Sequence, residues 1–584
     1  MSDIASSAPA SRRAGGFCGW LATQAGILLT ATVTIALALK FLLVFRININ
    51  WDEFYYLSFV QDYLRGTVSD RFQTLHVHFF AWLPMAAAKD EIGQILLARL
   101  VMAGCASASA LLLYGIARRF LSRDGALFGL LGYLATTAVI EHGTSFRTDS
   151  IATVLVLLAL FLILRRPGGA VGAAVAGLAM AVAAMITIKT AFYVAVMAPL
   201  IWFLGRDVRD RARLALAFGA CLVLAFAAIY WLHVSTLAPP GPSNATHYLQ
   251  GAASKVFFED GLFPRWAELL INLAQNPLFW LLTLQGVWVA RQAVRADETG
   301  SRRDRWLLLL LALPILTPLF YRNAFAYYYA FILPPAAVLI GMAYERYRRQ
   351  ALESNEPRPF RLLALLLCLQ CGVFLYQSGR NLPDAIEPQR ATLDAVHAVF
   401  PEPVPYIDGY GVVASFPRTG FFMSSWGVSE YREAGTPIFR DLVAKAQPPL
   451  LLADSPSLYA ALVPGVTVVP ERELLNADIA FLRDNYLQHW GMVFVAGKTI
   501  ELPALGEKVA FDVAIAGDYR LESAIPVHID GKELAPEGVV TLAAGTHSIL
   551  ADRATGPATL RWAGALPAPD TAPTDIWAFF SAGN

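Results

Sequence analysis

Charged residues and cysteines are scarce in this chain. Asp, Glu, Lys and Arg make up 16% of its 584 residues, whereas soluble domains carry roughly 25%. A soluble globular protein is therefore excluded, and the 56% hydrophobic content indicates an integral membrane protein. The net charge of +1 offers no electrostatic basis for a nucleic-acid partner. All five cysteines precede residue 372, which excludes a disulfide framework in the C-terminal region.

Long apolar runs fill the first 380 residues. A helix needs about 20 apolar residues to cross a bilayer, and runs of roughly that length, some shorter or broken by proline, occur at about 25–45, 92–117, 125–141, 148–165, 170–187, 190–205, 214–235, 276–292, 306–321, 327–344 and 361–377. Basic residues cluster on alternate loops, and the positive-inside rule assigns those loops to the cytoplasm. The N-terminus is then cytoplasmic. The loops 46–91 and 236–275 and everything after about 378 are external.

The fold class predicted is a polytopic α-helical membrane protein with about eleven spans and a C-terminal extracytoplasmic region. After residue 378 the composition becomes that of a soluble protein, and helix-like and strand-like segments alternate up to about 490. Short alternating strands with turns such as Asp530-Gly531 follow, a pattern typical of a β-sandwich. The predicted domains are a cytoplasmic tail (1–24), a transmembrane domain (25–378) with an external catalytic loop (46–91), an α/β domain (379–490) and a β-sandwich-like domain (491–584).

Two adjacent carboxylates, Asp52 and Glu53, follow the first apolar run within a few residues. Asn50 with an acid three residues later is a capping-box pattern, which predicts a helix that begins at Trp51. Asp52 and Tyr56 would share one face of that helix. We expect the aromatic residues to face lipid or a neighbouring helix. Capping alone would explain the acids, and it is compatible with a catalytic role.

Three further charges lie at membrane depth or at its external edge. Asp149 and Arg147 occupy the short loop before the fourth run, and Lys189 interrupts an apolar stretch. Such charges are costly and mark functional sites, although Asp149 also suits a helix start paired with Arg147 and Lys189 could extend to the interface. Arg322 lies on the external side, against the charge bias. Tyr328 belongs to an aromatic stretch expected at headgroup depth.

Together these features resemble the GT-C membrane glycosyltransferases, in the branch of the protein O-mannosyltransferases and the lipid A aminoarabinose transferase. The resemblance covers about residues 20–380. It consists of the Asp-Glu pair in the first external loop, an acid at the mouth of the fourth helix, and the Tyr-Tyr-x-x-x-x-Pro motif that ends at Pro334. Residues 75–84 match the second interfacial helix of that branch in place. Its Glu-Lys-Pro-Pro-like motif is absent, and Leu75-His76-Val77-His78 stands there instead.

The resemblance implies an inverting glycosyltransferase at the periplasmic face of a bacterial inner membrane. The donor would be a polyprenyl-phosphate-linked sugar, and the acceptor a glycan, a lipid or a protein. The residues implied are Asp52, Glu53 and Asp149 for catalysis, with Asp52 as general base; Arg147, Lys189, Arg322, His76 and His78 for the donor phosphate; and Tyr56 and Tyr328 facing acceptor or lipid.

Two points stay open in the sequence. Some GT-C enzymes bind a divalent metal, and Asp52 and Asp149 could hold Mg, Mn or Zn. A transporter or flippase of lipid-linked sugars, or a polysaccharide polymerase, would also have many spans and buried charges. A transporter should show inverted repeats, which we do not detect. Polymerases usually lack the Asp-Glu loop and carry their large external loop between spans.

Overall fold

The computed structural model describes residues 20, 23–88, 90–165, 169–239, 261–295, 299–353, 357–502, 507–551 and 556–573. Most of the predicted tail 1–24 and part of the predicted loop 236–275 lie outside these residues. The chain divides into two compact units. The membrane unit comprises residues 1–47, 62–83 and 96–384, and the C-terminal unit comprises residues 48–61, 84–95 and 385–584.

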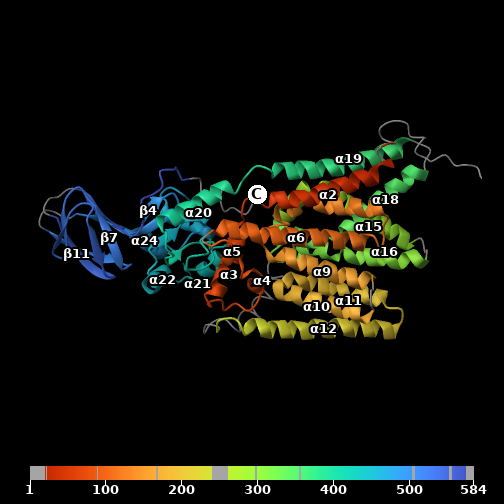
Figure 1. Cartoon of the computed structure of the whole chain (residues 1–584), viewed down its shortest axis with the longest axis horizontal. Coiled ribbons are helices and arrows are strands. Elements are labelled where there is room, and N and C mark those ends of the chain that lie inside the picture. Colours follow the sequence, from red (N-terminus) through yellow and green to blue (C-terminus); the bar gives the residue numbers. More distant parts are fainter. Residues whose placement is uncertain are drawn as a thin grey trace, which may run out of the picture. The chain divides into compact units, whose positions relative to one another are not determined.

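Each apolar run of the sequence forms one or two helices. Up to Arg380 the elements are α2 (Ala25–Leu43), α3 (Trp51–Leu64), α4 (His76–Phe80), α5 (Leu83–Ala86), α6 (Glu91–Ala117), α7 (Arg123–Leu134), α8 (Thr137–His142), α9 (Thr148–Arg165), α10 (Ala170–Ile186), η2 (Ile188–Thr190), α11 (Ala191–Leu204), α12 (Val208–Val234), α14 (Trp266–Gln275), α15 (Pro277–Arg295), α16 (Thr299–Leu311), η3 (Leu313–Leu319), α17 (Ala326–Ile332), α18 (Ala337–Glu353) and α19 (Pro357–Arg380) (Figure 1). The predicted fold class, a polytopic protein of mostly α-helical structure, is confirmed.

Five of the described helices are long and apolar enough to cross a membrane: α2, α6, α9, α12 and α19. The pair α17 and α18, bent by 66°, makes a sixth candidate. This is a multi-pass membrane protein. The number of about eleven spans stays a prediction, because several of the other runs are broken or short. Pro314 and Pro318, for example, fall in η3, and proline removes a backbone donor that an α-helix needs.

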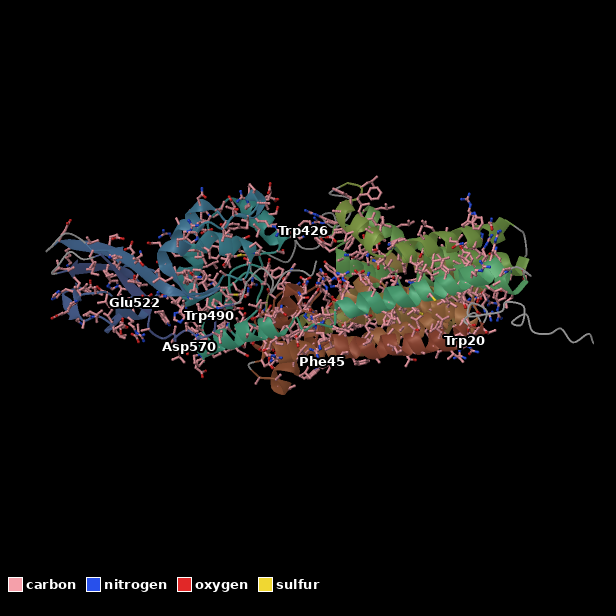
Figure 2. All side chains as sticks on the ribbon, turned by 90° about the horizontal axis from the view of Figure 1, so that it is seen from above. Trp20, Phe45, Trp426, Trp490, Glu522 and Asp570 are labelled. Carbon is pink, nitrogen blue, oxygen red and sulfur yellow. The ribbon has the colours of Figure 1, made fainter. Side chains whose placement is uncertain are left out.

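Helix α12 lies at the edge of the helices of the membrane unit (Figure 1), and only 11% of its apolar window is buried. Aromatic side chains, Trp20 and Phe45, lie at the two ends of α2 (Figure 2) and are exposed. Inside the membrane unit, small residues allow helices to pack closely, as glycine does where α7 contacts α18. A Cβ on Gly129 of α7 would lie 2.5 Å from the Ala337 carbonyl oxygen of α18. Such close backbone approach is the way membrane helices pack.

After residue 384, the described part of the C-terminal unit contains five α-helices, one short 3-10 helix and all the described strands. They are α20 (Glu387–Val399), β1 (Tyr406–Ile407), β2 (Arg418–Thr419), α21 (Ser425–Ala434), α22 (Phe439–Ala446), β3 (Leu450–Leu452), α23 (Pro456–Leu462), η4 (Pro470–Arg472), α24 (Asn476–Asn485), β4 (Tyr486–Trp490), β5 (Val493–Glu501), β6 (Lys508–Val513), β7 (Gly517–Glu522), β8 (Val527–Ile529), β9 (Lys532–Leu534), β10 (Val539–Leu542), β11 (Gly545–Ala551) and β12 (Pro557–Trp562). The strand-rich C-terminal region predicted from the sequence is confirmed.

Two sheets organise this unit. One has eight strands in the order β10-β7-β12-β5-β3-β1-β2, with β4 also paired to β5, and the other has the order β6-β11-β8-β9. Strand β1 is parallel to β2 and β3, whereas the remaining pairs are antiparallel. Strand β5 pairs with β3 on one side and β12 on the other. The predicted α/β and sandwich regions therefore share one continuous sheet across residue 490.

Polar side chains connect neighbouring strands of this sheet and attach the last described segment to it. Glu522 of β7 accepts hydrogen bonds from Arg561 of β12, the shorter at 2.6 Å. Trp490 donates its indole N–H to the Thr571 carbonyl at 3.0 Å, next to Asp570 in the last described segment (Figure 2). These bonds hold the segment 556–573 against the strands that precede it.

Candidate functional site

The start of α3 is a complete capping box. The Asn50 side chain accepts the Asp52 backbone N–H at 2.9 Å, and the Glu53 carboxylate accepts the Asn50 N–H at 3.0 Å. Glu53 is fully buried. The capping interpretation of Asn50 and Glu53 is thus confirmed. Since the Glu53 carboxylate fixes the first turn, Asp52 is left as the acid with a partly exposed side chain at the helix start.

The aromatic side of the first turns of α3 packs inside the C-terminal unit. The Trp51 ring stacks on Tyr410, with centroids 5.1 Å apart, and lies 5.2 Å from Phe422. Tyr55 stacks on Phe422 at 3.9 Å. The expectation that these aromatic residues face lipid or a neighbouring helix is wrong for Trp51 and Tyr55, because their neighbours are loop residues of the C-terminal region. Tyr56 is half-buried and lies beside Tyr55.

The capping box makes a prediction about Glu53. In Glu53→Gln the side chain still accepts the Asn50 N–H, because Gln also completes a capping box. We expect a melting temperature and a catalytic activity close to those of wild type. Glu53→Ala removes the acceptor, and we expect it to lose about 1 kcal/mol of stability. Thermal unfolding of both purified variants, with activity measured in parallel, checks this. A Glu53→Gln variant that is stable but inactive would assign Glu53 to the chemistry instead.

A buried ion cluster lies where α9 begins. Lys189 of η2 donates to Asp149 at 2.6 Å, and the Arg147 guanidinium lies 3.6 Å from the other Asp149 oxygen. Arg147, Asp149 and Lys189 are only 4%, 6% and 8% exposed. The ion pair expected between Asp149 and Arg147 is present, and the structure adds Lys189, which the sequence singled out separately. Two cations against one carboxylate leave one excess positive charge in a site of low dielectric constant, which favours an anionic ligand.

Tyr327 lies beneath both cations. The Arg147 guanidinium carbon is 3.4 Å from the centroid of the Tyr327 ring, and the Lys189 nitrogen is 4.7 Å from it. This is a cation–π arrangement, which favours a fixed cation position. The sequence did not single out Tyr327, and it assigned the neighbouring Tyr328 to the acceptor-facing or lipid-facing side; the Tyr328 ring centroid lies 5.8 Å from the Lys189 nitrogen. Tyr328 is fully buried, with its hydroxyl 2.5 Å from that of Thr317, so a lipid-facing position for it is wrong.

A narrow cavity opens beside the cluster, lined by Arg147, Asp149 and Tyr327 together with Lys40 and His142. Its volume of about 20 Å³ holds about one water molecule. Lys40 comes from the first apolar run and donates to the Val139 carbonyl. The sequence reasoning missed Lys40. A lysine inside a spanning segment was the available signal, because such charges rarely face lipid.

The two histidines of α4 have different surroundings. His78 Nε2 lies 2.8 Å from Nδ1 of His233, whose Nε2 lies 3.0 Å from the Thr74 hydroxyl. Burial lowers the pKa of His78, so its imidazole is neutral near pH 7 and adds no charge for a phosphate. His76 is buried edge-on against Phe146. The sequence reasoning did not identify His233.

Arg322 lies in the turn before α17. Its backbone carbonyl accepts a hydrogen bond from Arg265 at 3.2 Å. The Arg265 guanidinium itself lies 4.5 Å from the centroid of the Phe325 ring. Arg265 was only one of many charges in the predicted loop, and its position beside Arg322 could not be inferred from the sequence.

Metal ligation finds little support in the described part of the chain. No group of three or more His, Cys, Asp and Glu side chains there could hold a metal ion. Asp149 already faces two cations, Lys189 and Arg147. A dication at the same carboxylate would meet their repulsion, so Asp149 does not fit the metal-ligand role considered from the sequence.

The comparisons with known proteins concern the fold. No protein-family model and no curated protein match the chain. The solved structure of ArnT from Cupriavidus metallidurans, bound to undecaprenyl phosphate, aligns with a TM-score of 0.50 at 17% identity, over 78% of this chain and 96% of that one. The archaeal oligosaccharyltransferase AglB from Archaeoglobus fulgidus, in complex with an inhibitory peptide and a dolichol-phosphate, aligns with a TM-score of 0.52 at 11% identity, over 91% and 95%.

These two alignments concern the overall fold of the chain. The chain shares the fold of these two structures, which is the GT-C fold expected from the sequence. Identities this low show the fold alone, and the fold does not establish an activity. The residues that bear on function are Asp52 at the start of α3 and the buried cluster of Arg147, Asp149 and Lys189.

Proposed function

We propose that this chain is an inverting glycosyltransferase that moves a sugar from a polyprenyl-phosphate donor to an acceptor hydroxyl. The observation that carries the proposal is the buried cluster of Arg147, Asp149 and Lys189 over Tyr327 in a polytopic GT-C fold. An excess positive charge at this depth suits the phosphate of a lipid-linked donor. The ArnT and AglB structures contain undecaprenyl phosphate and dolichol-phosphate, which supports the same ligand class here.

The reaction is one displacement at the anomeric carbon. Asp52 takes the proton from the acceptor hydroxyl, and the hydroxyl oxygen forms a bond to C1. The bond from C1 to the phosphate oxygen breaks, and the lipid phosphate leaves with the electron pair. Proton transfer to a placed carboxylate contributes roughly 10²–10⁴-fold. Arg147 and Lys189 stabilise the charge that develops on the leaving phosphate, and Asp149 keeps both cations in place.

The other assignments follow from the same scheme. Arg322 and His76 remain candidates for the donor phosphate and Tyr56 for the acceptor side, whereas the neutral His78 would contribute at most a hydrogen bond and no charge. We place the N-terminus in the cytoplasm and the C-terminal unit in the periplasm of a bacterial inner membrane, on the basis of the alternating basic loops. A glycan, a lipid or a protein in the cell envelope would be the acceptor.

The test is a transfer assay with the purified full chain in membrane lipid extract. Undecaprenyl-phosphate donors that carry different radiolabelled sugars are supplied one at a time. The proposal predicts that one donor loses its label to a new product whose anomeric configuration is inverted. Movement of the donor across proteoliposomes without release of polyprenyl phosphate would indicate a flippase. Growth of a ladder of repeated units would indicate a polymerase.

A further inference from the structure

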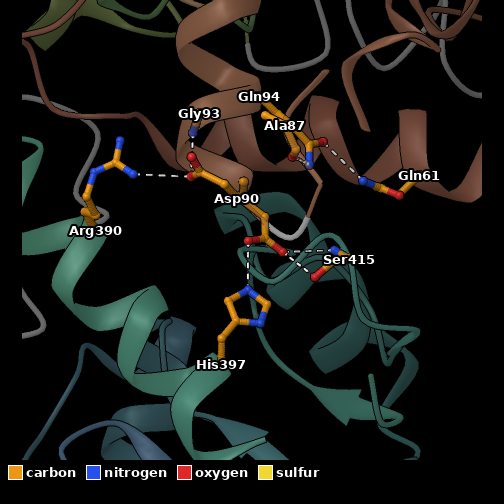
Figure 3. Close-up of polar contacts among 9 residues, drawn as sticks. Gln61, Ala87, Asp90, Gly93, Gln94, Arg390, His397 and Ser415 are labelled. Carbon is orange, nitrogen blue, oxygen red and sulfur yellow. Dashed lines mark hydrogen bonds and ion pairs between the residues drawn. The ribbon is translucent and has the colours of Figure 1, made fainter. Parts of the chain in front are cut away.

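Side chains of helix α20 in the C-terminal unit form hydrogen bonds and ion pairs with both ends of the predicted external loop that carries Asp52. At the far end of the loop, His397 bonds Glu91 at 3.0 Å and Arg390 lies 3.4 Å from Asp90. Ser415 donates its N–H and its hydroxyl to the same Glu91 carboxylate (Figure 3). At the near end, Gln389 bonds Ile49. The segments 48–61 and 84–95 accordingly fold as parts of the C-terminal unit.

The contact at the near end is the more specific one. The Gln389 side chain accepts the Ile49 N–H at 2.7 Å and donates to the Ile49 carbonyl at 2.8 Å. Gln389 is 1% exposed and Ile49 is fully buried. One amide thus satisfies both backbone groups of a residue that water does not reach. A buried backbone group that loses its bond is costly, so this site requires a side chain that both donates and accepts.

This bond pair leads directly to Asp52. Ile49 precedes Asn50, whose side chain accepts the Asp52 N–H at 2.9 Å. Gln389 is thus hydrogen-bonded to Ile49, and Asn50, the next residue in the chain, is hydrogen-bonded to the Asp52 backbone. Among the described residues, the side chain that bonds the Ile49 backbone is that of Gln389. Because the bonded residues lie within three positions of Asp52, the anchor restrains the backbone from which the Asp52 side chain extends.

We propose that Gln389 is a positioning residue for the base Asp52, so that the C-terminal unit contributes to the chemical step. This inference rests on the proposed function. Loss of the anchor should lower kcat and leave donor binding nearly unchanged, because the cations assigned to the phosphate belong to the membrane unit. Misplacement of a catalytic group by about 1 Å can cost on the order of 100-fold in rate. We expect kcat of Gln389→Leu to fall by about 10- to 100-fold.

Gln389→Glu should change the pH dependence of kcat, which a general loss of stability would not do. When protonated, the new carboxyl group donates to the Ile49 carbonyl and accepts the Ile49 N–H, as the amide does. When ionised, it still accepts the N–H but repels the carbonyl oxygen. The ratio of its kcat to that of wild type should rise as the pH falls. Taking the ratio cancels the titration of Asp52 itself.

The matched control is Gln447→Leu. Gln447 also joins two backbone groups of the C-terminal unit, accepting the Ala516 N–H at 2.6 Å and donating to the Ala514 carbonyl at 3.1 Å. Both of these partners lie between β6 and β7. Gln447→Leu should lower the melting temperature to a similar degree and leave kcat within twofold of wild type.

The experiment measures kcat, donor KM and equilibrium binding of undecaprenyl phosphate for wild type and the variants Gln389→Leu, Gln389→Glu, Gln447→Leu and Asp52→Asn. A fall in kcat confined to the Gln389 variants and Asp52→Asn supports the inference. An active wild type with an unchanged Gln389→Leu, or a flat pH ratio for Gln389→Glu, would overturn it. If Gln389→Leu does not fold, the pH ratio decides. A wild type without turnover on any donor would instead refute the proposed function.

Discussion

Asp52→Asn is expected to lower kcat by roughly 10²–10⁴-fold, while the protein still folds and inserts. Asparagine cannot take the proton from the acceptor hydroxyl. The start of α3 should survive the change, because the cap is formed by the Asn50 side chain and the Glu53 carboxylate rather than by the Asp52 side chain. Turnover of a labelled donor, compared with the melting temperature of the same preparation, separates loss of chemistry from loss of fold.

The control for this variant lies on the same helix. Asp62 is partly exposed and forms an ion pair with Arg65 at 3.1 Å. Such surface pairs contribute about 0–1 kcal/mol, so Asp62→Asn should keep its activity and stability. Near-normal kcat in Asp52→Asn would remove Asp52 from the mechanism.

Lys189→Met is expected to abolish transfer and to destabilise the protein by about 3–5 kcal/mol. The variant leaves the Asp149 carboxylate in the interior without the lysine that donates to it at 2.6 Å. Arg147, at 3.6 Å from the other oxygen, compensates for only part of that charge. The measurements are unfolding in detergent and transfer from the labelled donor. Lys498→Met is the control, since Lys498 pairs at 2.7 Å with Asp484, whose side chain is 61% exposed.

The double variant Lys189→Met with Asp149→Asn separates stability from function. Neutralising both partners removes the buried unpaired charge, so most of the lost stability should return. Transfer should not return, because the cation proposed for the leaving phosphate is still missing. If transfer recovers together with stability, the pair is structural only, and the phosphate role passes to Arg147.

Several features of the fold were accessible from local patterns. Long apolar runs predicted the five described helices that are long and apolar enough to cross a membrane, and Asn50 with Glu53 predicted where α3 begins. Asp149 and Lys189 were conspicuous because charges are rare at membrane depth. What the sequence could not show was that these two charges bond each other, since η2 and the start of α9 meet only in the folded chain.

The errors have two physical causes. Helical register separates Tyr327 from Tyr328, because adjacent residues on a helix point about 100° apart. The Tyr327 ring lies against both Arg147 and Lys189, whereas the Tyr328 ring is buried with its centroid 5.8 Å from the Lys189 nitrogen. The other errors arose because a side chain's partner lies far away in the sequence. Trp51 stacks on Tyr410, and Gln389 bonds Ile49. An aromatic helix face or a lone glutamine carries no local sign of such a partner.

The most direct measurement is the stoichiometry of polyprenyl phosphate release by the purified full chain. Wild type and Asp52→Asn are incubated side by side with the labelled donor that supports transfer, in membrane lipid extract. We predict one polyprenyl phosphate released per sugar transferred by wild type, and release near the uncatalysed background from Asp52→Asn. Equal release from both proteins, or no release from wild type with any donor sugar while the donor still binds tightly, would contradict the assignment of this chain as a glycosyltransferase that uses Asp52 as its base.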